Sequence, residues 1–313
     1  MRSLVKRVLY HSGLLGLAGL ARRRTGALVL RYHAVTEGDA EVLYATPEIC
    51  MPLAAFRRQM AFVRRAYTVL PLGELVERVD RGATLPPRAL AITFDDGYAD
   101  NHRLALPVLR GLGLTATVFV ATGSLDGGPP LWMSAVRALV GTGRHQAARA
   151  LTRELVPLAG PARAERIAAA AAAAGVDPGR ALAGAMLTWA QVRELAAAGW
   201  TIGAHTVSHP NVALAAPAEA EAEIAGSRDA IAAVVGGPVG HFAYPNAGGA
   251  HRYFDDASAA LLRRLGFRAA LTSRPGVLGA GSDPYALPRI GVGPRLAPVS
   301  ELAAALARQR LAA

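Results

Sequence analysis

The chain of 313 residues contains a single cysteine, Cys50. One thiol excludes an internal disulfide, and it also excludes a zinc site built from several cysteines. A chain without disulfides is typical of a cytoplasmic protein, but it is also compatible with an exported bacterial protein. The cysteine content therefore limits the chemistry of a metal site without deciding the compartment.

Lysine is equally rare, because Lys6 is the only one and arginine carries nearly all of the net charge of +11. Such a charge raises the question of nucleic-acid binding. The arginines are scattered, however, and the sequence has no basic stripe interleaved with aromatic residues and no nucleic-acid-binding motif. We therefore expect no nucleic-acid partner. An anionic membrane surface is a better match, because positive charge is concentrated near the N-terminus.

The apolar stretch near the N-terminus, residues 8–21, is too short for a membrane-spanning helix, which needs roughly 20 apolar residues. It is compatible with a helix packed on the domain, an amphipathic helix on a membrane, or a signal peptide. Three arginines at 22–24 would directly follow a cleavage site, which is unusual. We predict that residues 1–26 are retained and contact the domain or an anionic membrane. The protein is then cytoplasmic or peripheral at the membrane, and export is the alternative.

Strands and helices alternate along the rest of the chain, as hydrophobic periodicity and turn residues indicate. Residues 34–52 are predicted to form an irregular loop. The alternation is typical of a parallel sheet of about seven or eight strands with right-handed helical crossovers. The predicted strands are residues 27–32, 68–70, 90–94, 115–120, 200–204, 268–272 and 287–292, and the predicted helices are 53–66, 72–79, 99–112, 217–235, 255–265 and 301–311.

Residues 127–187 interrupt this alternation with several helical stretches rich in alanine and arginine. One of them, residues 168–174, is an unbroken alanine run with high helix propensity and little to bury. We interpret the segment as a helical insertion that forms a lid or a partner surface, with low-complexity drift as the alternative. Thr188 and Gln191 then fit a capping box at the start of the next helix.

Two adjacent carboxylates, Asp95 and Asp96, directly follow the predicted strand 90–94 and precede Gly97. Glycine permits a sharp turn at a strand end. Neighbouring carboxylates at a buried strand end repel each other and lose solvation, so a cation, a proton or an arginine must offset their charge. A helix N-cap is the simpler alternative for an aspartate at such a turn.

A pair of histidines, His205 and His209, follows the predicted strand 200–204. One helical turn would place both imidazoles on the same side, which is a common spacing for metal ligands. The zinc-protease helix requires glutamate directly after the first histidine, and Thr206 occupies that position. With a spare carboxylate from another strand end, the pair predicts a metal site of two histidines and one carboxylate with open coordination positions.

Taken in this order, Thr-Phe-Asp-Asp-Gly at 93–97 and His-Thr-x-x-His at 205–209 resemble the motifs of the polysaccharide deacetylases, carbohydrate esterase family 4, also called the NodB homology domain. The resemblance extends over about residues 28–295. It implies a distorted (β/α) barrel of about seven parallel strands. It also implies that Asp95 is the general base, and that Asp96, His205 and His209 hold one divalent ion, zinc or a similar metal.

The stretch 241–249 resembles the third motif of this family, in which an aromatic–proline turn lines the site. This implies substrate-binding roles for Tyr244, Pro245 and Asn246. The domain organisation that we expect is a basic and apolar segment at 1–26, a barrel at 27–297 that carries the insertion at about 127–187, and a C-terminal helix at 298–313.

The family resemblance implies removal of acetyl groups from N-acetylated sugars of a polysaccharide or glycoconjugate. A divalent ion lowers the pKa of water, and an adjacent carboxylate accepts the proton as that water attacks the amide. A sugar ester deacetylase and a catalytically impaired carbohydrate-binding member remain alternatives. A phosphoryl-transfer enzyme with an aspartate nucleophile is a further one, but it leaves the histidine pair unexplained.

Two family features are missing from this sequence. Phe242 stands where an arginine often opens the third motif, and no histidine after residue 251 can supply the usual late Leu-x-x-His. In a closed barrel, Arg289 of the last predicted strand would approach Asp95 and hold it ionised by lowering its pKa. His33, which follows the first strand, is a candidate for the acid or for substrate binding, with a structural strand cap as the alternative.

Overall fold

The structure is a computed structural model that describes residues 26–38, 40–246 and 251–312. The predictions for the N-terminal segment up to residue 25, and for the end of the third motif at 247–250, lie outside the described residues. Among the helices of the described residues, none is both long and apolar enough to cross a membrane.

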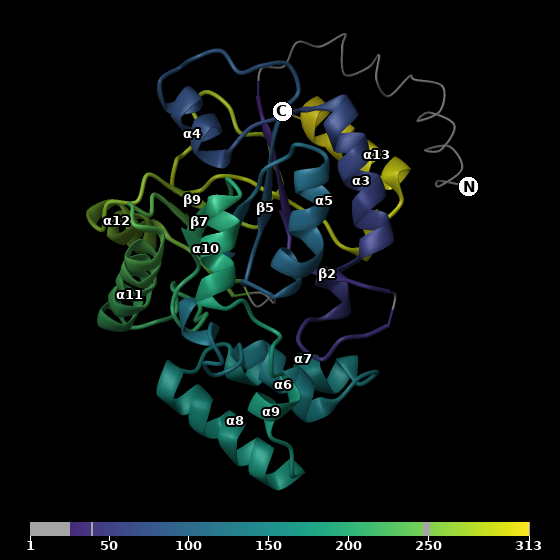
Figure 1. The fold of residues 1–313 in the computed structure, drawn as a ribbon. Helices are drawn as coiled ribbons and strands as arrows, with labels where there is room; N and C mark the ends of the chain where they lie inside the picture. Colours follow the sequence, from purple (N-terminus) through teal and green to yellow (C-terminus); the bar gives the residue numbers. More distant parts are fainter. Residues whose placement is uncertain (1–25, 39, 247–250, 313) are drawn as a thin grey trace.

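A curled parallel sheet organises the chain as a distorted (β/α) barrel (Figure 1). Seven strands follow one another in the order β10, β1, β5, β6, β7, β8 and β9, and β4 pairs with the start of β5. A parallel bridge between Leu271 and Leu287 brings the two edges together. The predicted fold class is therefore confirmed. The strands are β1 (Leu28–Tyr32), β4 (Thr68–Val69), β5 (Ala89–Phe94), β6 (Thr117–Val120), β7 (Thr201–Ala204), β8 (His241–Ala243), β9 (Ala269–Leu271) and β10 (Ile290–Gly291).

The register of the strands brings the residues that follow them to one end of the barrel. Tyr32 of β1 pairs with Phe94 of β5, so the next residue of each chain segment emerges at the same level. Val120 of β6 pairs likewise with Ala204, the last residue of β7. β5 is buried along its whole length because apolar side chains face both the barrel interior and the outer helices. The carboxyl ends of parallel strands are where barrel enzymes place their chemistry.

Helices surround the sheet, and Figure 1 shows α3, α5 and α13 on one side and α10, α11 and α12 on the other. The predicted helix 99–112 begins instead as a π-helical turn, Asn101–Ala105, before α5. Pro107 lies just after this junction and has no N–H for a regular helical hydrogen bond. The helices are α3 (Leu53–Ala66), α4 (Leu72–Asp80), α5 (Leu106–Gly111), α10 (Trp189–Ala197), α11 (Pro217–Val235), α12 (Asp256–Arg264) and α13 (Val299–Ala312).

The segment 34–52 is more regular than the predicted loop. Its two ends, β2 (Ala34–Thr36) and β3 (Cys50–Pro52), pair as a small parallel sheet, and a 3-10 turn, Pro47–Ile49, precedes β3. The pairing was missed because two strands of three residues are too short to show a period of two. β8 was also missed, because residues 241–249 were assigned to the third motif and not to a strand.

The buried carboxylate of Asp100 ties this segment to the barrel. Its Oδ1 accepts hydrogen bonds from the Val35 backbone N–H at 3.0 Å and from Asn101 Nδ2 at 2.8 Å. Its Oδ2 accepts a hydrogen bond from the Tyr44 hydroxyl at 3.0 Å. Burial raises the pKa of Asp100 to about 7, because these hydrogen bonds only partly offset the lost solvation.

We expect Asp100 to make stability depend on pH. The folded protein retains a proton that the unfolded chain releases between its usual pKa of 3.8 and about 7. The free energy of unfolding therefore falls as pH rises through this window, by up to about 1.4 kcal/mol per pH unit. Urea denaturation across the window should give a flatter pH slope for Asp100→Asn than for wild type. The exposed Asp80→Asn is the control, and equal slopes for Asp100→Asn and wild type would contradict this account.

The segment predicted as a helical insertion contains four helices, α6 (Trp132–Val140), α7 (His145–Leu155), α8 (Gly160–Ala174) and α9 (Pro178–Ala181). In Figure 1 they lie together at one end of the barrel. Trp132, Val136 and Leu155 contribute to a small apolar core of their own. The predicted capping box of Thr188 and Gln191 is present and starts α10.

Candidate active site

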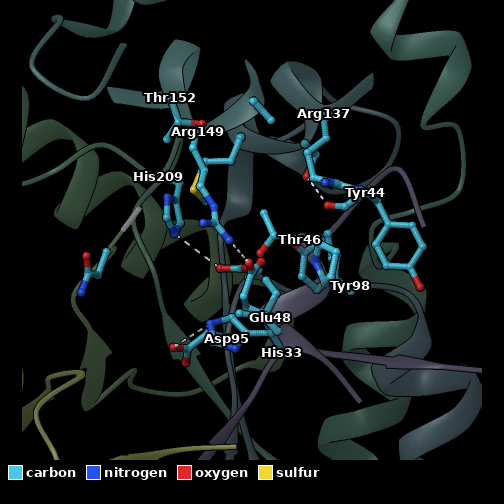
Figure 2. Close-up of a pocket in the computed structure, with 18 of the residues that line it drawn as sticks. His33, Tyr44, Thr46, Glu48, Asp95, Tyr98, Arg137, Arg149, Thr152 and His209 are labelled. Atoms are coloured by element: carbon cyan, nitrogen blue, oxygen red, sulfur yellow. Dashed lines mark hydrogen bonds and ion pairs between the residues drawn. The ribbon is translucent and has the colours of Figure 1, made fainter. Parts of the chain in front are cut away.

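A cavity of about 620 Å³ lies between the carboxyl ends of the strands and the insertion. His33, Asp95 and His205 line it from the barrel, and residues of α6 and α7 line it from the insertion. Figure 2 shows His33 and Asp95 of the barrel on one side of the cavity, with Arg149 and Thr152 of the insertion on the other. The residues predicted from separate strand ends therefore share one site.

The pairing of Asp95 with Arg289 dominates the barrel side of the site. Arg289 NH1 donates to Asp95 Oδ1 at 2.6 Å, and NH2 donates to Oδ2 at 2.8 Å. The guanidinium is fully buried and also donates from Nε to the Thr272 carbonyl at 2.9 Å. Burial alone would raise the pKa of Asp95, but the charge of Arg289, the nearby imidazoles of His205 and His33 and the hydrogen bonds from Arg289 together lower the pKa to about 2. Asp95 is thus ionised and held in one orientation.

Asp96, His205 and His209 form a second cluster at the same strand ends. Asp96 Oδ1 lies 3.4 Å from Nε2 of His205 and 3.4 Å from Nε2 of His209. All three side chains are buried. Burial would raise the pKa of Asp96, but its contacts with the two imidazoles hold it well below the usual range. Burial lowers the pKa of His209, which favours the neutral imidazole that binds metals.

The geometry of this cluster fits a divalent metal ion. Metal–ligand bonds of about 2.0–2.2 Å at tetrahedral angles separate neighbouring donor atoms by about 3.3–3.6 Å. His205 Nδ1 donates to the Ala243 carbonyl at 2.7 Å, so the lone pair of its Nε2 is free for a ligand. His209 Nδ1 is buried and has no hydrogen-bond partner among the described residues. Asp96, His205 and His209 can therefore hold a metal ion.

The two histidines do not lie on a helical turn, so that part of the prediction is wrong. Thr206 and His209 have positive φ values of 67° and 60°, which bend the loop so that both rings face Asp96. Glu223 of α11 accepts hydrogen bonds from the backbone N–H groups of Val207 and Ser208, each at 2.8 Å. The Trp132 indole of α6 donates to the His209 carbonyl at 2.9 Å. Tertiary contacts, rather than helix formation, therefore place the pair.

Backbone strain also accompanies the paired aspartates. Asp96 has a φ of 76° and Gly97 a φ of 87°. A Cβ atom at Gly97 would lie 3.1 Å from Val120 Cγ1, so both conformation and space favour glycine there. A non-glycine residue in the left-handed region costs of order 1 kcal/mol or more and is often found at functional sites.

The remaining predicted residues occupy different positions. His33 lines the cavity, and its Nε2 lies 3.9 Å from Asp95 Oδ2. Tyr244 and Asn246 also line it, although the Tyr244 hydroxyl already donates to the Tyr285 carbonyl at 3.0 Å. Pro245 is buried and is not part of that lining.

Several residues that line the cavity have no recognisable signature in the sequence. Arg31 at the end of β1, and Arg137, His145, Arg149 and Arg153 of the insertion, all line the cavity. The four-residue spacing of His145, Arg149 and Arg153 on α7 is visible in the sequence. The helical face that they share can be assigned to a cavity only when the packing partner of the helix is known. Tertiary placement was therefore the missing information.

Comparison with known proteins decides the family. A sequence model described as Polysaccharide deacetylase matches residues 82–270, which contain both the aspartate pair and the histidine pair. The chain belongs to the polysaccharide deacetylase family. The resemblance to carbohydrate esterase family 4 is thereby confirmed.

Individual deacetylases agree with this assignment. The curated protein named Putative polysaccharide deacetylase YxkH, from Bacillus subtilis (strain 168), is 22% identical over 267 residues, which are 85% of this chain and 71% of that protein. Among solved structures, Streptococcus pyogenes deacetylase PplD in complex with acetate has a TM-score of 0.62 at 20% identity and is aligned over 88% of this chain and 96% of its own. IcaB from Ammonifex degensii also has a TM-score of 0.62 at 20% identity, over 90% and 96% of the two chains. This chain and these two solved structures therefore share one fold.

Proposed function

We propose that the protein is a metal-dependent hydrolase that removes acetyl groups from N-acetylated sugars of a polysaccharide or glycoconjugate. The observation that carries this proposal is the paired carboxylate Asp95, held by Arg289 beside a metal-binding cluster of Asp96, His205 and His209. Asp95 does not belong to this cluster, so its carboxylate is available for proton transfer. Membership of the polysaccharide deacetylase family supports acetylated sugars as substrates.

Zinc is the ion that we propose for the cluster. Two imidazoles and one carboxylate are a common donor set for catalytic zinc, which keeps a further position open. A bound zinc ion would polarise the acetyl carbonyl and lower the pKa of water toward about 7.

Asp95 acts in this proposal as the general base. Its carboxylate accepts the proton of the attacking water, while Arg289 acts as a positioning residue that keeps both oxygens in place. Because Arg289 lowers the pKa of Asp95, the carboxyl group does not retain the proton. Asp95 can therefore pass the proton to the leaving nitrogen, which cannot depart as an amine anion.

His33 is proposed to contact the substrate rather than to donate the proton. Burial lowers the pKa of His33 to about 4, so the ring is neutral near pH 7. A neutral imidazole can still form a hydrogen bond with a sugar hydroxyl or acetamido group. We propose the same substrate-binding role for Tyr244 and Asn246. The retention of residues 1–26, their membrane contact and the cellular location remain predictions.

Acetate release from defined oligosaccharides tests the proposed function. The purified protein is stripped of metal, reloaded with zinc and assayed on N-acetylated oligomers of the chitin, peptidoglycan and poly-N-acetylglucosamine types. We expect zinc-dependent acetate release from at least one of them. Asp95→Asn should lower the rate by about 10²–10⁴, because it removes the base and leaves the cluster intact. His102→Ala, a surface variant in which the lost histidine pairs with Glu194, is the control.

Two outcomes would favour the alternatives instead. Acetate release only from an O-acetylated sugar would identify an ester deacetylase. Binding of an oligomer without acetate release, by folded and zinc-loaded protein, would identify a carbohydrate-binding member of the family.

A further inference from the structure

A row of basic side chains faces the cavity from the insertion. His145, Arg149 and Arg153 follow one another at intervals of four along α7, and all three line the cavity. Residues four apart share one face of a helix, and like charges at this spacing destabilise an isolated helix by about 0.2–0.5 kcal/mol. The row therefore needs anionic partners.

The carboxylates near this row do not neutralise all of the positive charge on this wall of the cavity. Glu41 Oε1 lies 2.8 Å from His145 Nε2, and the same side chain is 3.6 Å from the buried guanidinium of Arg137. Glu48 pairs with Arg149 across the cavity (Figure 2). Arg153 has no ion pair or hydrogen bond with any residue that the structure describes. Three guanidiniums on this wall thus face two carboxylates.

The barrel wall adds a further guanidinium. Arg31 lines the same cavity and donates to the Ser273 hydroxyl, but no carboxylate of the described chain forms an ion pair with it. Its Nε atom is buried without a hydrogen-bond partner among those residues. The nearby Asp95 is already paired with Arg289. On the barrel wall the two guanidiniums of Arg31 and Arg289 match the two carboxylates of Asp95 and Asp96. The unmatched positive charge therefore lies on the insertion wall.

We propose that the glycan bound in this cavity is anionic, and that Arg149 and Arg153 hold a carboxylate or phosphate group close to the acetylated sugar. The inference rests on the proposed function for the acetylated sugar itself. Guanidinium groups bind such anions through paired, charge-assisted hydrogen bonds, whereas a neutral oligosaccharide leaves their charge unmatched. Glu48 occupies Arg149 in the free protein, and the anionic group replaces it on binding.

Binding to matched oligosaccharides tests this inference without turnover. Isothermal titration calorimetry on metal-free protein at low ionic strength compares three probes: a neutral tetrasaccharide of N-acetylglucosamine, one in which glucuronate alternates with N-acetylglucosamine, and the neutral one with a phosphate at its reducing end. We expect at least one anionic probe to bind about tenfold more tightly than the neutral probe. The probe that binds more tightly identifies the carboxylate or the phosphate as the anion.

Three variants connect the preference to the proposed residues. The double variant Arg149→Gln, Arg153→Gln should reduce the ratio of anionic to neutral affinity to about twofold or less. Glu48→Gln should increase the ratio, because it removes the internal competitor for Arg149. Arg166→Gln is the control, since this arginine belongs to the same insertion, pairs with Glu154 and does not line the cavity.

Two results would overturn the inference: no greater affinity for either anionic probe than for the neutral one, or a preference that survives in the double variant. Its failure is distinguishable from failure of the proposed function. Acetate release from neutral oligomers without any anionic preference overturns only the inference. Preferential binding of an anionic probe without acetate release from any oligomer overturns only the proposed function.

Discussion

Arg289→Met should lower turnover about a hundredfold or more while the metal content of the protein stays the same. Both oxygens of Asp95 lose their hydrogen-bond donors, and a base displaced by even 1 Å can cost about a hundredfold in rate. Among the described residues, the guanidinium donates hydrogen bonds to Thr272, Thr93 and Asp95. None goes to the cluster of Asp96, His205 and His209, so we expect that cluster to stay in place. Steady-state kinetics with elemental analysis of the same preparation measures both quantities.

The pH profile separates this positioning role from a purely structural one. With Arg289 present, the pKa of Asp95 is about 2, so the carboxylate is ionised throughout the usual assay range. Without the neighbouring charge, burial raises that pKa, and the acidic limb of activity moves to higher pH. A structural defect alone would lower activity at every pH without moving the limb. Near-normal turnover, or a reduced rate with an unmoved limb, would contradict the assigned role.

Stability provides a control for the same variant. Removing one partner of a buried ion pair leaves an uncompensated charge, which costs about 3–5 kcal/mol. The double variant Arg289→Met, Asp95→Asn leaves no unpaired charge and should recover much of that free energy of unfolding without recovering activity. Arg268→Met, at an exposed arginine, is the matched control for loss of a guanidinium.

His205→Ala and His209→Ala should each weaken metal binding by more than a hundredfold. Loss of a residue that only orients a ligand already costs about 10–100-fold in affinity, and loss of a ligand costs more. Elemental analysis after dialysis against a weak chelator should find about one zinc ion per wild-type chain and little in either variant. Competition with a chromogenic chelator gives the affinities.

The surface variant His102→Ala is the control for loss of an imidazole, and it should bind zinc like wild type. Zinc should also raise the melting temperature of wild-type protein, because an ion that binds only the folded chain stabilises it. Equal, sub-stoichiometric metal in wild type and both variants would end the idea of a metal site. Full metal content in His205→Ala would instead remove that residue from the ligand set.

The sequence predicted the parts of the site that depend on strand ends. The apolar strand before Asp95 and the strand before His205 were recognisable, and parallel strands carry such residues to one end of a barrel. The same logic placed Arg289 near Asp95, because a closed sheet brings the last strand beside the first. The general arrangement of the fold followed from the alternation of strands and helices.

The parts that could not be predicted depend on contacts between distant segments. The loop from His205 to His209 takes its shape from Glu223 and Trp132, which belong to two other helices. The left-handed backbone at Asp96 and His209 has no signature in residue type, since neither position is glycine. The cavity wall formed by α7 likewise required knowledge of where the insertion packs.

The separation of 194 residues between Asp95 and Arg289 has a consequence for the order in which the protein is assembled. During synthesis, β5 and the Asp95 that follows it emerge long before the segment that carries the counter-ion of Asp95. Burial of Asp95 is costly until the last strand docks, so barrel closure and charge neutralisation occur together. We therefore expect the pair of Asp95 and Arg289 to form only after the chain has been synthesised beyond Arg289.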